Sequence, residues 1–179
     1  MKLLHERKRF IALTIVIFLV NYCLDRITKS LALKYLSNRE PIRLFHDLLI
    51  FRYAENTGAF LSMGTHWNVA IKYLVLLIIP IIICIIGIGH LMFREQKRYR
   101  IIIISCIIGG GIGNLVDRLF NAFKVIDFIN VGIGNIRTGI LNVADLSVTF
   151  GCIALMICEG LESKKIKKAG NSERQQGQD

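Results

Sequence analysis

Apolar residues gather along this chain into long blocks that are separated by short clusters of charged residues. Four blocks, residues 10–33, 69–93, 101–120 and 140–158, approach the length of helix that crosses about 30 Å of hydrocarbon. The second contains "YLVLLIIPIIICIIGIGHLMF", which leaves no polar face for water, and a membrane helix tolerates the proline within it. The pattern therefore predicts an all-α membrane protein with four transmembrane helices, in preference to a soluble domain.

The connection between the first two blocks, residues 37–67, has a different pattern. Apolar and polar residues alternate over parts of "PIRLFHDLLIFRYAENTGAFLSM", and "ENTG" is typical of a turn. We expect a small extracytoplasmic β element here, which is either a lid or substrate cradle, or a mere connector. The blocks and this segment form one predicted domain over residues 1–163. The basic tail, residues 164–179, is expected to be disordered and cytoplasmic.

The composition, 53% apolar with a net charge of +10 over 179 residues, supports this class. Nucleic-acid-binding domains are seldom both apolar and basic, so we expect no nucleic-acid partner. The first block follows a basic stretch, as in a signal peptide, but "NYCLDRITKS" offers no small-x-small cleavage site, so we interpret it as a retained span. The five cysteines and four histidines lack metal-ligand spacing, and we expect neither a metal nor another cofactor.

Basic residues orient the spans, because loops that stay in the cytoplasm carry an excess of lysine and arginine. One dense cluster precedes the first span, a second fills the connection between the second and third spans, and a third follows the fourth span. They are Lys2, Arg7, Lys8 and Arg9; Arg94, Lys97, Arg98 and Arg100; and Lys164, Lys165, Lys167 and Lys168. Both termini are therefore predicted to face the cytoplasm.

With this topology, the polar residues within the spans all fall at the level of the outer leaflet. Asp25 and Lys29 lie near the end of the first span, Asn114, Asp117 and Arg118 near the end of the third, and Asn142 and Asp145 near the start of the fourth; Asp127 follows the third span. Helical spacing gives each span one polar face. The faces carry Asn21, Asp25 and Thr28; Gly110, Asn114, Asp117 and Asn121; and Asn142, Asp145 and Thr149. In a bilayer such faces turn toward one another.

Several of these residues have a purely structural interpretation. Asp25 with Lys29, and Asp117 with Arg118, could be ion pairs that lock helices together. Asn114 and Asn142 could form hydrogen bonds between helices, and the G-x-x-x-G step from 109 to 113 is typical of close helix packing.

Asp127 and Asp145 differ, because no basic residue lies at helical spacing from either. Two unpaired acids in a medium of low dielectric can share one proton, and such a pair supplies a base and an acid for amide hydrolysis. Gly132, Gly134 and Gly139 are expected to give the flexible outer loop that lets the two acids meet. The residues alone leave open a structural pair or a proton-coupled transporter. A transporter usually has more spans or internal repeats, and neither is found. A lipid head-group transferase would need carboxylates arranged for Mg²⁺.

The motifs "DRITK", "ENTGAF", "GGGIGNLVDR", "VIDF" and "LNVAD" follow one another in this order on the four spans. Together they resemble the lipoprotein signal peptidase (signal peptidase II) family of bacterial intramembrane aspartic proteases. The resemblance implies cleavage of a prolipoprotein just before its diacylglyceryl-modified cysteine, with Asp127 and Asp145 as the catalytic dyad. It implies a multi-pass protein of the bacterial cytoplasmic (inner) membrane with its active site near the outer leaflet.

The resemblance also implies supporting residues and partners. Residues that match the family's motifs, and are expected to hold substrate or backbone near the dyad, are Asn56, Gly58, Asn114, Asp117, Arg118, Asn142, Asp25 and Lys29. The expected partners are the lipidated prolipoprotein, membrane lipids and globomycin-type cyclic peptide inhibitors, and the chain is expected to be a monomer. Two positions depart from the family: Gly58-Ala59-Phe60 stands where it usually reads G-A-A-F, and Leu141 where it has Phe. Both could reshape the pocket wall without touching a carboxylate.

Overall fold

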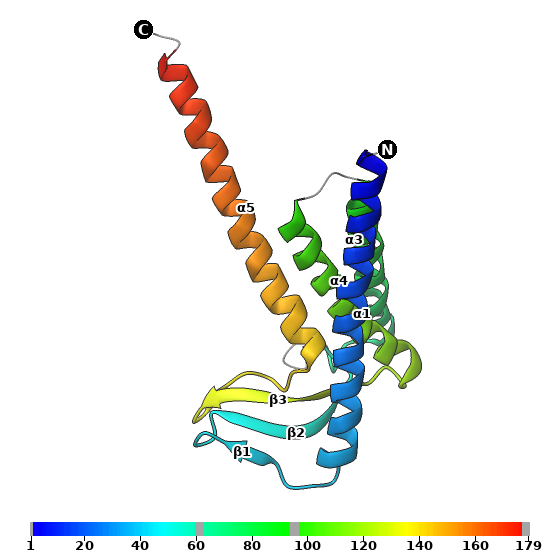
Figure 1. Cartoon of the computed structure of the whole chain (residues 1–179). Helices are drawn as coiled ribbons and strands as arrows, with labels where there is room; N and C mark the ends of the chain where they lie inside the picture. Colours follow the sequence, from blue (N-terminus) through cyan, green and yellow to red (C-terminus); the bar gives the residue numbers. More distant parts are fainter. Residues whose placement is uncertain (1, 60–62, 94–96, 177–179) are drawn as a thin grey trace.

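The long apolar blocks fold into four helices that stand on a small β-sheet (Figure 1). The computed structural model describes residues 2–59, 63–93 and 97–176. Phe60, at the departure from the family motif, and Arg94, in the second basic cluster, lie outside the described residues. Four helical segments are long and apolar enough to cross a membrane, over Lys8–Leu36, Val69–Phe93, Arg98–Phe120 and Val143–Lys168. The predicted class, a helical membrane protein with four spans, is confirmed.

The helices have the following bounds. They are α1 (Lys2–Leu36), α2 (Val69–Tyr73), α3 (Ile79–Phe93), α4 (Arg98–Phe120) and α5 (Val143–Gln176). A π-helical turn, Leu74–Ile78, joins α2 to α3 within one span. It ends two residues before Pro80, whose ring would clash with the carbonyl of Leu76 in a regular α-helix, and the wider turn relieves that clash. The second span therefore passes through its proline without a break.

α4 lies between α1 and α5 because small residues on two of its faces let both neighbours approach closely. A Cβ added at Gly113 would lie 2.6 Å from Oδ2 of Asp25 on α1, and one at Gly110 would lie 2.6 Å from the backbone oxygen of Ala144 on α5. Gly109 faces Asn21 of α1 in the same way. The close-packing interpretation of the G-x-x-x-G step is confirmed.

The sheet lies at one end of the helices and is antiparallel, with the order β1-β2-β3-β4. The strands are β1 (Ile42–Leu44), β2 (Leu49–Asn56), β3 (Val125–Ile133) and β4 (Ile136–Arg137). The register pairs Ala54 with Asp127 and Asn56 with Val125, and a register shift between Phe51 and Ala54 interrupts the β2–β3 ladder. This pairing sets the end of β2 beside Asp127.

Two predictions about these segments were wrong. Residues 125–139 are not a flexible loop: 125–133 form a strand, because its β-branched residues, Val125, Ile126, Ile129, Val131 and Ile133, favour pairing with β2. Glycine is needed at Gly134, where φ is +54°, and at Gly132, where a Cβ would lie 2.3 Å from the backbone oxygen of Ile136 on β4. The tail after residue 163 is also helical as far as Gln176, because its lysine, glutamate, arginine and glutamine residues are good helix formers and no proline interrupts them.

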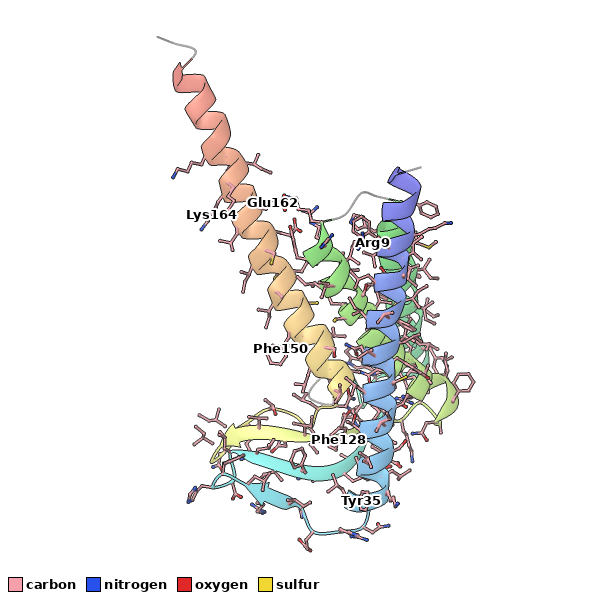
Figure 2. All side chains as sticks on the ribbon, viewed as in Figure 1. Arg9, Tyr35, Phe128, Phe150, Glu162 and Lys164 are labelled. Carbon is pink, nitrogen blue, oxygen red and sulfur yellow. The ribbon has the colours of Figure 1, made fainter. Side chains whose placement is uncertain are left out.

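The opposite end of the molecule, away from the sheet, carries a second polar group. Figure 2 shows Arg9, Glu162 and Lys164 toward that end, and Tyr35 and Phe128 at the sheet. Arg100 of α4 donates two hydrogen bonds of 2.6 Å to the carboxylate of Glu159 on α5, and Lys97 pairs with Glu162. These contacts fix the ends of α4 and α5 that lie far from the sheet.

Replacing Gly113 with alanine is expected to lower the free energy of unfolding by about 1–3 kcal/mol, because the new methyl group overlaps the buried carboxylate of Asp25. Gly89→Ala is the matched control, since a Cβ there meets nothing within 4 Å. Thermal or denaturant unfolding of both variants in detergent measures the difference. Equal stability of the two variants would contradict the packing described here.

Candidate active site

Polar side chains from α1, α4, α5 and two strands meet at the end of the helices that faces the sheet. Every residue that the sequence motifs predicted to belong to the site lies here. They are Asp25 and Lys29 on α1, Asn56 and Gly58 at and after the end of β2, Asn114, Asp117 and Arg118 on α4, Asp127 on β3, and Asn142 and Asp145 at the start of α5. Hydrogen bonds and ion pairs join them into one network.

The start of α5 is a capping box, and one of the two candidate acids is part of it. Asn142 Oδ1 accepts a hydrogen bond of 2.9 Å from the backbone N–H of Asp145, and Asp145 Oδ2 accepts one of 3.1 Å from the backbone N–H of Asn142. The local motif N-x-A-D therefore starts the helix by itself. It also places a carboxylate in the first turn, where the helix dipole favours negative charge.

Asp127 is held by two asparagines from different elements. Asn142 Nδ2 donates to its Oδ1 at 2.6 Å, and Asn56 Nδ2 donates to its Oδ2 at 3.0 Å. The side chain is only 2% exposed. Burial, with the negative charge of Asp145 as the next cause, raises the pKa of Asp127 to about 7. The carboxyl can thus exchange a proton near neutral pH.

Asn142 and Asn114 connect the two acids. The amide of Asn142 contacts Asp127 directly, while Asn114 Nδ2 donates to Asp145 Oδ1 at 2.8 Å. The two amides are themselves joined, because Asn142 Nδ2 also donates to Asn114 Oδ1 at 3.1 Å. The two acids are therefore linked through these two asparagines, which fix the orientation of both carboxylates.

Behind the two acids lies a buried cluster of charges. Lys29 is 2% exposed, and its ammonium lies 2.9 Å from Asp25 Oδ2, 2.7 Å from Asp117 Oδ2 and 2.8 Å from Asn114 Oδ1. The ammonium thus forms ion pairs with two carboxylates and donates a hydrogen bond to the amide oxygen of Asn114. The predicted Asp25–Lys29 ion pair is confirmed. Because Asn114 accepts from Lys29, its amide must turn its NH₂ toward Asp145.

The sequence interpretation missed Arg26. Its guanidinium lies 2.7 Å from Asp117 Oδ1 and 2.9 Å from Asp25 Oδ2, and it also donates to the backbone oxygen of Gly113. Asp117 therefore pairs with Arg26 and Lys29, and the suggested pair with Arg118 was wrong. Arg26 is visible in "DRITK", directly after Asp25. Adjacent helix positions point to different faces, so the sequence did not suggest a contact, and only the length of the arginine side chain lets its guanidinium reach Asp25 and Asp117.

Asp25 has a further contact with α5. Its Oδ1 accepts a hydrogen bond of 3.1 Å from the backbone N–H of Ala144, in the first turn of that helix. A carboxylate from α1 thus satisfies one of the backbone donors that every helix start leaves unpaired. The contact therefore fixes the position of the start of α5 along the axis of α1.

Arg118 and Asn56 hold the turn after β2 against the helices. Arg118 Nη2 donates to the backbone oxygen of Gly58 at 2.8 Å, and Asn56 Oδ1 accepts from the backbone N–H of Gly58 at 2.8 Å. Asn56 Nδ2 also reaches the backbone oxygen of Ala59. This turn forms the wall of the site beside Asp127.

Four polar residues of the predicted faces do not join the site, and one of them is Asn21, whose amide donates to the hydroxyl of Ser147 on α5 at 3.0 Å. The Thr28 hydroxyl donates to the backbone oxygen of Leu24 in its own helix, Asn121 donates to the backbone oxygen of Lys124 after α4, and Thr149 is exposed. A threonine hydroxyl can form its hydrogen bond within its own helix. Helical spacing therefore predicts more site residues than the structure has.

Two hydrogen-bonded acids, the buried Asp127 and the half-buried Asp145, lie at one end of four helices that are long and apolar enough to cross a membrane, an arrangement expected of a membrane enzyme. The sequence profile of the signal peptidase (SPase) II family matches residues 16–160. The lipoprotein signal peptidase of Borrelia hermsii is 36% identical over 164 residues, which cover 89% of this chain and 95% of the relative. That of Treponema denticola is 34% identical over 80% of this chain and 87% of its own.

Solved structures agree with this relationship. A bacterial membrane enzyme determined by the in meso method at 2.3 Å resolution superposes with a TM-score of 0.75 at 26% identity, covering 87% of this chain and 92% of its own. A second, at 1.9 Å resolution, gives 0.70 at 25% identity, covering 83% and 93%. The chain belongs to the signal peptidase II family. The resemblance seen in the five sequence motifs is confirmed, and the chain is a multi-pass membrane protease of lipoprotein processing.

Removing the ammonium of Lys29 is expected to destabilise the fold strongly. Lys29→Met leaves the buried carboxylates of Asp25 and Asp117 with less compensation, and breaking a buried pair in this way costs about 3–5 kcal/mol. Lys34→Met is the matched control, because Lys34 is an exposed lysine on the same helix and its loss is expected to cost less than about 0.5 kcal/mol. Unfolding in detergent measures both. A Lys29 variant as stable as the control would show that the cluster does not hold the helices.

Proposed function

We propose that this chain is an aspartic endopeptidase that removes the signal peptide of diacylglyceryl-modified prolipoproteins by cutting just before the lipidated cysteine. Membership of the signal peptidase II family supports the removal of lipoprotein signal peptides. The observation that carries the aspartic mechanism is the pair formed by the buried Asp127 and the half-buried Asp145, which are joined through Asn142 and Asn114.

In this mechanism the two acids divide the work according to their surroundings. Asp145 lies in the first turn of α5, where the helix dipole stabilises a negative charge, and this position suits a general base. Asp127 is the carboxyl whose pKa lies near 7, so it can carry the shared proton. A water held between them gives its proton to Asp145 and attacks the scissile carbonyl, while Asp127 donates its proton to the carbonyl oxygen. The tetrahedral intermediate then collapses as a proton passes to the leaving amide nitrogen.

The supporting residues are proposed to hold the acids and the substrate. Asn142, Asn114 and Asn56 fix the carboxylates, and Arg118 with the Gly58 turn orders the wall against which the peptide backbone lies. The charge cluster around Lys29 is proposed to support these residues without touching the reacting atoms.

We propose a location in the cytoplasmic (inner) membrane, as membership of the family suggests, and the arrangement of the helix ends supports an orientation with both termini in the cytoplasm. Lys97, Arg98 and Arg100 lie at the end of α4 that is far from the sheet, and the acids lie at the end near it. If the basic end faces the cytoplasm, the dyad lies near the outer leaflet, where a lipidated cysteine would present its scissile bond. We propose that the chain acts as a monomer, since one chain supplies all of the residues of the site.

Asp127→Asn and Asp145→Asn are each expected to lower the cleavage of a diacylglyceryl-modified prolipoprotein on the order of a thousandfold or more, because each removes one of the two proton-transfer groups. Glu40→Gln, at an exposed acid outside the site, is the control and should keep full activity. A globomycin-type cyclic peptide should abolish cleavage by the native protein. Turnover retained by either aspartate variant, with normal insertion into the membrane, would exclude the dyad.

The rate of cleavage is expected to fall as pH rises through about 7. Asp127 has a pKa raised to about 7, so its proton-donating form is present below that pH and is lost above it. The value of kcat/KM should therefore fall about tenfold for each further pH unit. A pH–rate profile measures this, and unfolding followed at each pH shows that the fall is not denaturation. A profile that is flat or rising between pH 6 and 9 would contradict the role of Asp127 as acid.

A further inference from the structure

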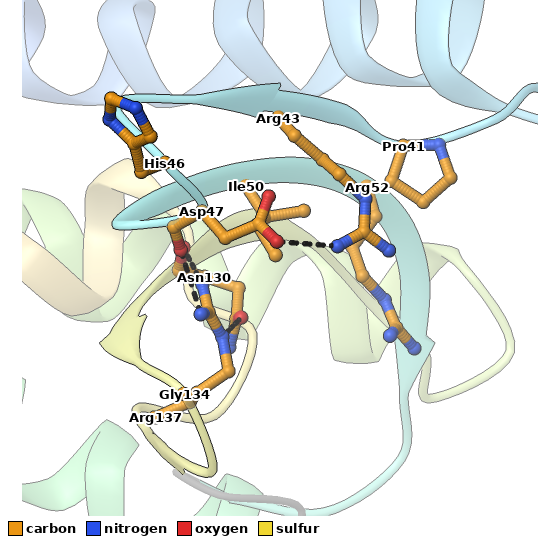
Figure 3. Close-up of a pocket in the computed structure, with 9 residues that line it drawn as sticks. All are labelled: Pro41, Arg43, His46, Asp47, Ile50, Arg52, Asn130, Gly134 and Arg137. Atoms are coloured by element: carbon orange, nitrogen blue, oxygen red, sulfur yellow. Dashed lines mark hydrogen bonds and ion pairs between the residues drawn. The ribbon is translucent and has the colours of Figure 1, made fainter.

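A pocket lined by arginines lies on the sheet (Figure 3). Its volume is about 400 Å³, and Arg43 of β1, Arg52 of β2 and Arg137 of β4 line it. Its one lining carboxylate is that of Asp47, in the turn between β1 and β2. The lining side chains thus carry three positive charges against one negative charge.

The pocket lies on the opposite face of the sheet from Asp127. Arg43 pairs across the strands with Ile50, and Ile50 with Asn130, so these three pocket residues point to one face. Asp127 is three positions before Asn130 on the same strand, and side chains alternate between faces with a period of two residues. The proposed peptidase reaction therefore makes no use of the pocket.

The guanidinium groups of the pocket are only partly neutralised. Arg43 pairs with Asp47 at 3.0 Å. Arg137 donates to neutral oxygens alone, namely the backbone oxygens of Asp47, Gly132 and Asn130 and the amide oxygen of Asn130. Arg52 is exposed and has no partner among the described residues. A planar guanidinium with free N–H groups beside two others matches the oxygens of a phosphate group.

The end of the sheet next to the pocket presents apolar side chains to the outside. Ile133 and Ile136, on either side of the β3–β4 turn, are 77% and 86% exposed, and Phe45 in the β1–β2 turn is 73% exposed. In Figure 1 these two turns lie at the same end of the sheet, on the side toward which α5 leans. Exposed apolar residues beside basic ones, on a sheet joined directly to membrane-spanning helices, are typical of a surface that contacts lipid.

The fold keeps the β1–β2 turn in a strained conformation. Phe45, His46 and Asp47 have φ values of 52°, 53° and 66°, a left-handed run that residues with side chains seldom adopt. Arg137 holds the turn by its hydrogen bond of 2.7 Å to the backbone oxygen of Asp47, and the backbone N–H of Gly132 donates to Leu48 at 2.9 Å. Such strain persists where the surrounding contacts enforce a particular arrangement, here the one that lines the pocket with Asp47 and exposes Phe45.

We propose that this pocket binds the phosphate of an anionic phospholipid head group of the outer leaflet, while Phe45, Ile133 and Ile136 contact the apolar region beneath. Arg52 and Arg43 contact the phosphate, and Arg137 shapes the pocket between the two turns. The bound lipid anchors the free end of the sheet at the membrane surface. The proposal rests on the pocket and on membrane insertion, and does not depend on the peptidase mechanism.

Native mass spectrometry of the full chain, stripped of lipid in detergent, tests this. Phosphatidylglycerol and phosphatidylcholine with the same acyl chains are added in turn, and we expect preferential retention of phosphatidylglycerol. Arg52→Gln should weaken this retention about fivefold, and Arg43→Gln with Arg52→Gln further still. Arg39→Gln is the matched control, since it removes the same charge at an exposed arginine outside the pocket and should leave retention unchanged.

Four results would overturn the proposal. The first is equal retention of the two lipids by the native protein, and the second is equal loss in the Arg52 and Arg39 variants. The third is displacement of the lipid by inorganic phosphate at a similar concentration, which would make the ligand a soluble anion. The fourth is displacement by an acidic peptide whose own binding is lost in Arg52→Gln, which would make the pocket a peptide site. Cleavage activity close to that of the native protein shows that each variant is folded.

Discussion

The structure depends on the burial of Lys29. An ammonium that is removed from water inside a membrane protein needs negative charge and a hydrogen-bond acceptor close by. Here two helices supply them: the carboxylates of Asp25 on α1 and Asp117 on α4, and the amide oxygen of Asn114 on α4. This demand fixes the rotation and depth of α1 against α4. Arg26 completes the balance of charge, because two carboxylates beside a single cation would leave one negative charge uncompensated.

The same contacts extend by single hydrogen bonds to the two acids of the site. Asn114 accepts from Lys29, so its NH₂ group must donate toward Asp145. Asp25 accepts from the backbone of Ala144 and so holds the start of α5, where the capping box of Asn142 and Asp145 has formed locally. The buried charge cluster has no proposed part in bond cleavage. It nevertheless determines the orientation of Asp127 and Asp145, the two carboxylates that are proposed to cleave the bond.

The sheet contributes two side chains of the site, Asp127 and Asn56, that the four helices do not carry. β3 carries Asp127 to the start of α5, and its pairing with β2 brings Asn56 to the same carboxylate. Because side chains alternate on a strand, the opposite face is left free for a different surface, and there the strained β1–β2 turn and Arg137 build a pocket of positive charge. One strand thus serves the acid pair on one face and supports the arginine pocket on the other.

The sequence by itself determined the four spans, the end of the molecule at which polar residues gather, and the family, because hydrophobic length and motif order are local properties of the chain. It also determined the capping box and the Asp25–Lys29 pair, which lie within four residues. Only the tertiary structure decided that Asp117 pairs with Arg26 and Lys29, that β3 joins the sheet, and that Asn142 links to Asp127. These contacts join residues up to 91 positions apart, and their partners follow from how the helices and strands pack, which no local pattern records.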